Sequence, residues 1–199
     1  AEPAPEAERS DVLECLPERE RDSLSQLRVR AVTRAANAPS GALEDGILRL
    51  RSWAQKVHWP ASGSVTKENW GDVTPRWRWM GFQSNNPRTD FRAGILAVDN
   101  LVYFCERRPH EAETLMLEAS SDALDYPFAV ASINVSHMIA WYLSLVSGPN
   151  PAGPESTVEP LADSVQLGAF ARLCLQVAVT SDSKDEHLDA FGELYIAAM

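Results

Sequence analysis

Long hydrophobic runs are missing from this sequence. No stretch approaches about eighteen consecutive apolar residues, so no helix is expected to cross a membrane. The first nine residues are acidic and rich in proline, and they lack the apolar core of a signal peptide. We expect 1–9 to be a disordered tail. Residues 10–199 are enough for one domain with a substantial core.

Cysteine is scarce. The three cysteines, Cys15, Cys105 and Cys174, are odd in number and far apart, and each has apolar neighbours. A disulfide framework is typical of small secreted domains with an even number of cysteines, so this pattern does not predict one. Buried, reduced thiols in a cytoplasmic protein are the expectation.

Positive charge is also in short supply. Lysine and arginine number 18 against 28 acidic residues, which leaves a net charge of −10. Nucleic acids and anionic membrane surfaces both select a basic face, so neither is an expected partner. The six tryptophans could in principle stack on bases. Without interleaved lysines, we expect most of them in the core or as anchors of a loop.

The usual signatures of a catalytic or cofactor site are lacking too. The four histidines show no metal-ligand spacing, and His137 is expected to be a core histidine. There is no Gly-x-x-x-x-Gly-Lys phosphate loop and no Gly-x-Ser-x-Gly elbow. We therefore expect this chain to bind neither a metal nor a nucleotide cofactor of its own.

What the sequence does contain is helical periodicity. Apolar residues recur at helical spacing, whereas no alternating strand pattern lasts more than a few residues. The pattern predicts an all-α protein of six to eight helices packed in layers. The predicted helices include residues 24–35, 43–57, 95–105, 111–119, 128–146, 161–177 and 188–195. The segment 128–146 is apolar on several faces, which indicates a central, heavily buried helix.

The most specific stretch runs from Trp77 to Phe104. Its first half holds tryptophans, a glycine, a proline and short polar runs, and its second half is apolar and periodic. If the helix in the second half of this stretch begins at Asp90, a good N-cap, Arg92 falls in its first turn. A cation there opposes the helix dipole by about 0.3–1 kcal/mol. Two explanations are open. Arg92 forms a salt bridge with Asp90 or Asp99, or its charge is screened at the surface; alternatively, Arg92 is available to an anionic partner.

This stretch resembles the ELMO domain, the module of the engulfment-and-motility and ELMO-domain-containing proteins. The family pattern is matched in order by Trp77, Gly81-Phe82-Gln83, Pro87, Thr89-Asp90-Phe91-Arg92 and Asn100-Leu101-Val102-Tyr103-Phe104. Downstream, Tyr126-Pro127-Phe128-Ala129-Val130 and Ile133-Asn134-Val135 resemble a second family segment. The likeness covers roughly 42–199, with its motif core at 77–146.

The resemblance implies an α-helical domain that acts on small GTPases of the Arf and Arl group. In the branch of the family that keeps the arginine, this residue is supplied in trans for GTP hydrolysis, and here that residue would be Arg92. The resemblance assigns the loop around it a supporting role. Its supporting residues would be Trp77, Gln83, Thr89, Asp90 and Phe91.

Two departures from the family pattern leave an alternative open. Ser84 stands where the family usually has glycine, and only Ala93-Gly94 follows the arginine where the arginine branch has Gly-x-Gly. The shorter loop favours a non-catalytic interaction or scaffold module within a larger cytosolic or cytoskeletal assembly. The retained Thr-Asp-Phe-Arg favours a regulator that stimulates GTP hydrolysis.

Overall fold

The computed structural model describes residues 16–33, 41–59, 70–91, 94–119, 126–146, 151, 153, 168–172 and 186–199. The tail 1–9, Cys15, Cys174 and most of the predicted helix 161–177 lie outside these residues. The described part of the chain is helical throughout its regular elements and contains no strand, which confirms the all-α class. By its internal contacts the chain divides into one unit of 1–32 and 135–199 and another of 33–134.

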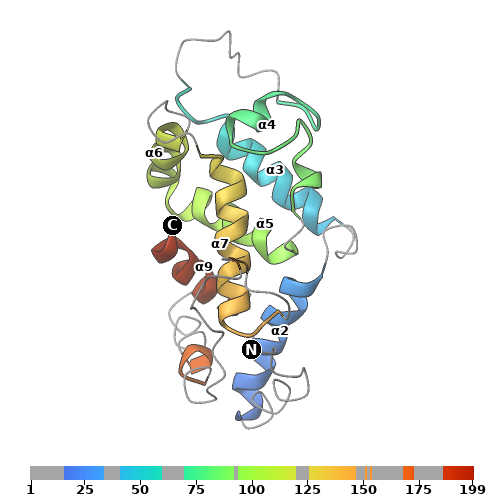
Figure 1. The fold of residues 1–199 in the computed structure, drawn as a ribbon, viewed down its shortest axis with the longest axis vertical. Coiled ribbons are helices and arrows are strands. Elements are labelled where there is room, and N and C mark those ends of the chain that lie inside the picture. Colours follow the sequence, from blue (N-terminus) through green and yellow to red (C-terminus); the bar gives the residue numbers. More distant parts are fainter. Residues whose placement is uncertain are drawn as a thin grey trace. The chain divides into compact units, whose positions relative to one another are not determined.

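The unit 33–134 is built on two packed helices. They are α3 (Ala42–Ala54) and α5 (Ile95–Arg107), and they lie side by side in Figure 1. The apolar face predicted for α5 is confirmed, since Ile95, Val98 and Leu101 are all buried. The unit also holds α4 (Arg76–Trp79), the 3-10 helix η3 (Pro87–Thr89), α6 (Pro109–Ala119) and the start of α7 (Phe128–Tyr142).

A glycine lets α3 and α5 approach closely. A Cβ added at Gly46 would stand 2.3 Å from Val98 Cγ1 and 3.8 Å from Val102 Cγ2. Val98 is buried and β-branched, so its side chain has few rotamers into which it could retreat.

We therefore expect Gly46→Ala to destabilise the protein although alanine is the better helix former. Overpacking costs about 1–3 kcal/mol, whereas the gain in helix propensity is at most about 1 kcal/mol. Urea unfolding should show a net loss of roughly 1–2 kcal/mol. In a Val98→Ala background the same change should cost much less, because the opposing methyl is gone. Equal costs in the two backgrounds would contradict this packing account.

The helix considered above with Asp90 as its N-cap does not begin there: α5 begins at Ile95, the first residue of the predicted segment 95–105, so Arg92 precedes its first turn. Gly94 precedes it with φ +89°, a conformation that redirects the chain into the helix. The Ile95 N–H, one of the first donors without a partner inside the helix, donates to the Thr33 carbonyl at 3.0 Å. Asp90 instead is the C-cap residue of η3, and the Asp90 N–H donates to the Pro87 carbonyl.

Two further helix ends differ from the predicted ones. α3 ends at Ala54, ahead of Pro60, and Trp59 Nε1 donates to the Ala54 carbonyl at 2.9 Å. That bond satisfies one of the last helical acceptors, which have no partner inside the helix. α7 ends at Tyr142, and its burial is less complete than predicted, because Met138 and Tyr142 are each 42% exposed.

The other unit contains α2 (Glu18–Val32), which packs against α9 (Glu186–Ala198). Leu24 and Leu27 of α2 and Phe191 and Tyr195 of α9 are fully buried. Phe170, within the short described helical segment 168–172, lies edge-on to Phe191 with ring centroids 6.4 Å apart. In the described residues, no helix combines the length and the apolar character needed to span a bilayer.

Candidate functional site

A series of aromatic rings supports the loop 70–91, which we call the aromatic loop. Trp79, Trp59, Trp70, Trp77, Phe82 and Phe91 touch in that order, with successive ring centroids 5.1–6.0 Å apart. The last three contacts are edge-to-face, the geometry in which aromatic pairs contribute about 0.5–1.5 kcal/mol beyond their burial. Trp77 and Phe91 are buried, so the loop is held from inside.

Polar contacts shape the end of the aromatic loop. The carboxylate of Asp90 accepts the Gln83 backbone N–H at 2.6 Å and the Thr89 hydroxyl at 3.1 Å. The Ser84 hydroxyl donates to the Asn86 carbonyl and accepts the Asn86 N–H. A charged acceptor bonded to a backbone donor makes a strong hydrogen bond, so Asp90 ties the end of the loop to its middle.

The loop is also joined to the start of α7. Met80 and Gly81 carbonyls accept the N–H groups of Ala129 and Val130 at 2.9 and 3.3 Å. These donors belong to the first turn of a helix, where no intrahelical acceptor exists for them. The same contacts therefore cap α7 and fix the place of the aromatic loop.

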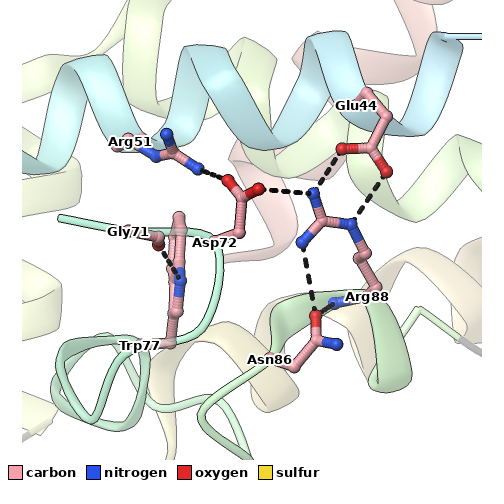
Figure 2. A network of polar contacts seen from close by, with 7 residues as sticks. All are labelled: Glu44, Arg51, Gly71, Asp72, Trp77, Asn86 and Arg88. Atoms are coloured by element: carbon pink, nitrogen blue, oxygen red, sulfur yellow. Dashed lines mark hydrogen bonds and ion pairs between the residues drawn. The ribbon is translucent and has the colours of Figure 1, made fainter.

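A network of four charged residues holds both ends of the aromatic loop against α3 (Figure 2). The Arg88 guanidinium makes two bonds to the Glu44 carboxylate, with Nε 2.8 Å from Oε1. Arg88 Nη2 also lies 3.8 Å from Asp72 Oδ2. Asp72 in turn forms an ion pair with Arg51 of α3. We call Glu44, Arg51, Asp72 and Arg88 the charge network. The Thr74 N–H, which donates to the Asn85 carbonyl at 2.9 Å, closes the loop as well.

The charge network lowers the pKa of its two acids. Hydrogen bonding by Arg88 lowers the pKa of Glu44, and hydrogen bonding by Arg51 lowers the pKa of Asp72. The bond with Glu44 likewise raises the pKa of Arg88. All three shifts favour the ionised pair in the folded protein.

These shifts predict acid sensitivity. Because the folded pKa of Glu44 lies below its unfolded value, the folded state binds fewer protons, and this stability is present above about pH 4.3. It is lost as the pH falls through the folded pKa. We expect the melting temperature of Glu44→Gln to lie about 1–3 °C below that of the wild type at pH 6, since exposed pairs contribute little. The gap should narrow as the pH falls below about 4.3 and close once the pH is below the lowered pKa of folded Glu44. A gap of constant size down to the pH of acid unfolding would contradict the prediction.

The predicted supporting residues of the loop differ in burial and in their contacts. Trp77 is buried, and its Nε1 donates to the Gly71 carbonyl at 3.2 Å; Phe91 is buried against Phe82. Gln83 is an exposed residue, and its backbone N–H donates to the Asp90 carboxylate. The Thr89 hydroxyl donates a hydrogen bond to the Asp90 carboxylate. Arg92 and Ala93 lie outside the described residues.

Sequence reasoning missed the charge network entirely. Glu44 and Arg88 are distant along the chain, as are Arg51 and Asp72, and no local pattern marks either pair. The exposure of Trp79, at 42%, was likewise not signalled by its sequence neighbours. Only tertiary contacts bring these groups together.

Other reactive groups in the described part of the chain do not form a site. No group of three or more His, Cys, Asp and Glu residues there could hold a metal ion. Cys105 is a buried, free cysteine, and burial raises the pKa of its thiol, which suppresses the reactive thiolate. Burial also lowers the pKa of the half-buried His137.

Comparison with known proteins adds to this geometry. Residues 22–199 match the family model described as the ELMO/CED-12 family. ELMO domain-containing protein 2 of Mus musculus is 38% identical over 74 residues, which is 37% of this chain and 25% of that protein. ELMO domain-containing protein B of Dictyostelium discoideum is 35% identical over 79 residues, 39% of this chain and 26% of that protein.

ELMO domain-containing protein C of Dictyostelium discoideum is 37% identical over 125 residues, 61% of this chain and 17% of that protein. No solved structure matches the chain significantly. The aligned part thus spans about a quarter or less of the length of these curated relatives. The family model, however, covers nearly the whole chain, and the helical fold agrees with it. This chain belongs to the ELMO/CED-12 family.

Proposed function

We propose that this chain regulates a small GTPase of the Arf/Arl group by supplying Arg92 in trans to stimulate GTP hydrolysis. Residues 10–199 would act as one ELMO domain in this role. The proposal needs no metal or nucleotide site in this chain, since the GTPase brings its own nucleotide and Mg²⁺. It also places the activity in the cytoplasm, where such GTPases meet GTP.

The chemistry of the reaction explains why an arginine is suited to the task. Hydrolysis spreads negative charge over the γ-phosphate oxygens in the transition state. A guanidinium stays charged at every physiological pH and presents forked donors that match phosphate oxygens. An arginine held in advance at the right place stabilises that charge without reorganising at the moment of reaction.

The observation that carries the proposal is the anchoring of the backbone on both sides of Arg92. Before it, the Asp90 carboxylate binds the Gln83 N–H and Phe91 is buried among aromatic rings. After it, Gly94 is buried and the Ile95 N–H is bonded to Thr33. A short segment fastened at both ends suits the presentation of one charged side chain. Arg88 is a poorer candidate than Arg92 for the arginine supplied in trans, because its guanidinium is already paired with Glu44.

A second candidate is a non-catalytic interaction module within a larger assembly. The observation in its favour is the short link from Arg92 to α5, where Ala93-Gly94 replaces the Gly-x-Gly of the arginine branch and the helix starts directly at Ile95. Alanine resists the positive φ values that glycine adopts freely. Under this candidate the partially exposed Trp79 would be a contact residue.

Single-turnover GTP hydrolysis by a panel of Arf-like GTPases separates the two candidates. Each GTPase is loaded with GTP and mixed with wild-type chain or with Arg92→Ala. Stimulation by the wild type that is lost in the variant supports the first candidate. A panel in which the wild type binds a GTPase but stimulates none would overturn it and favour the interaction module.

A further inference from the structure

We propose that Arg88 is a positioning residue for the turn 87–90, which we call the motif turn and which precedes Phe91 and Arg92 in the chain, and that it acts through its ion pair with Glu44. Its role in GTP hydrolysis rests on the proposed function, but its role in holding the motif turn does not. The pair joins η3, which leads directly into Asp90 and Phe91, to the first turn of α3. The charge network as a whole therefore links the motif to a helix far away in the sequence (Figure 2).

The contacts of Arg88 fix the orientation of its side chain, although its partner Glu44 is half exposed. Its guanidinium meets Glu44 through both Nε and Nη2, the two-point geometry that fixes orientation as well as distance. Its backbone N–H donates to Asn86 Oδ1 at 3.2 Å, and Nη1 lies 3.5 Å from the same oxygen. The side chain is 25% exposed. Backbone and side chain are thus held together in one turn.

The network also closes the aromatic loop at its base. Asp72 stands at the start of the loop and Arg88 near its end, and the two charged groups are 3.8 Å apart. Asp72 pairs in addition with Arg51 of α3. Both ends of the loop are therefore fastened to the same helix, on which Glu44 and Arg51 lie two turns apart and hence on one face.

Such a network controls local order more than overall stability. Exposed ion pairs contribute little to the free energy of unfolding. Loops, however, open with much smaller free energies than whole domains, so the same contact can decide how often a turn opens. Loss of the Arg88–Glu44 pair should loosen residues 82–91 while the helices that carry them keep their protection.

The chain offers a matched control on the same helix. Arg49 of α3 binds Glu106 of α5, with Nε 2.9 Å from Oε1, and this pair is also exposed and two-pointed. Asp45 and Asp99 also lie near Arg49, and none of these residues belongs to the aromatic loop. Arg49→Gln therefore removes an equivalent ion pair without touching the loop.

The test combines hydrogen exchange and hydrolysis for the wild type, Arg88→Gln, Glu44→Gln, the double variant and Arg49→Gln. We expect exchange of the amides in 82–91, including the Gln83 N–H, to become roughly threefold to tenfold faster in either single variant. The double variant should exchange no faster than Arg88→Gln alone, because that single variant already removes the contact with Glu44 as well as the one with Asp72. Arg49→Gln should leave exchange in 82–91 unchanged.

Unchanged exchange in Arg88→Gln, or equal loosening in Arg49→Gln, would overturn the positioning role whatever the GTPase result. With a GTPase that the wild type stimulates, Arg88→Gln should lower the maximal rate roughly threefold to tenfold at unchanged affinity. Full stimulation by a loosened Arg88→Gln variant would overturn the functional role of the pair. If the wild type stimulates no GTPase while Arg88→Gln loosens the turn, the proposed function fails but the positioning of the turn is upheld.

Discussion

Arg92→Ala is expected to abolish the stimulation of GTP hydrolysis, with a loss of about 10³–10⁵-fold in the stimulated rate. The size follows from the role: a trans arginine contributes mainly in the transition state, where charge builds up on the γ-phosphate oxygens. The maximal rate should therefore fall while the affinity for the GTP-loaded GTPase changes little. Single-turnover hydrolysis at saturating chain, paired with a binding titration, measures the two quantities separately.

Two control variants sharpen this result. Arg92→Lys keeps a positive charge but loses the forked donors, so it should restore only a small part of the rate. Arg78→Ala removes an exposed arginine of α4, in the aromatic loop but away from the motif turn, and should stimulate like the wild type. Stimulation that survives in Arg92→Ala, or falls equally in Arg78→Ala, would remove Arg92 from the mechanism.

Gly81→Ala is expected to be among the most destabilising single changes in the protein, by about 3–5 kcal/mol. Gly81 has φ +86°, and an added Cβ would lie 2.3 Å from the Phe128 nitrogen, 2.6 Å from the Pro127 carbonyl carbon and 2.9 Å from the Ala129 nitrogen. These are backbone atoms at the start of α7, so they cannot move aside as a flexible side chain can. The clash would also break the bonds by which Met80 and Gly81 cap the helix.

Gly41→Ala is the matched control for this substitution. Gly41 has a similar φ of +93°, but an added Cβ would meet nothing within 4 Å. Its substitution should carry only the backbone penalty, about 1–2 kcal/mol. Urea unfolding of both variants isolates the packing part of the Gly81 effect. Equal losses in the two variants would show that the close approach of the loop to α7 contributes nothing.

Helices were the most predictable part of this fold. Helical spacing is a property of near neighbours in sequence, so Ile95, Val98 and Leu101 reveal their common face without knowledge of the rest of the chain. The predicted helices around 43–57, 95–105, 111–119 and 188–195 accordingly correspond to α3, α5, α6 and α9. Their ends were less predictable, because caps depend on where the next segment of chain lies.

The start of α5 illustrates this limit. Asp90 has the residue type of an N-cap, but its carboxylate is occupied by the Gln83 N–H, and the helix begins only after Gly94. The donor at Ile95 is satisfied by Thr33, a residue of a distant segment. Local propensity was thus overruled by hydrogen-bond partners that only the folded chain supplies.

The amino-acid sequence by itself determined the all-α class, because helical spacing is local, and it carries the motif from Trp77 to Phe104, whose resemblance to the ELMO domain implies Arg92 as the candidate site residue. Only the tertiary structure decided how that motif is supported: the series of aromatic rings, the contact of Gly81 with α7 and the charge network around Arg88. The physical reason is that ring packing, close backbone approach and ion pairing depend on distances in space between residues far apart in the chain.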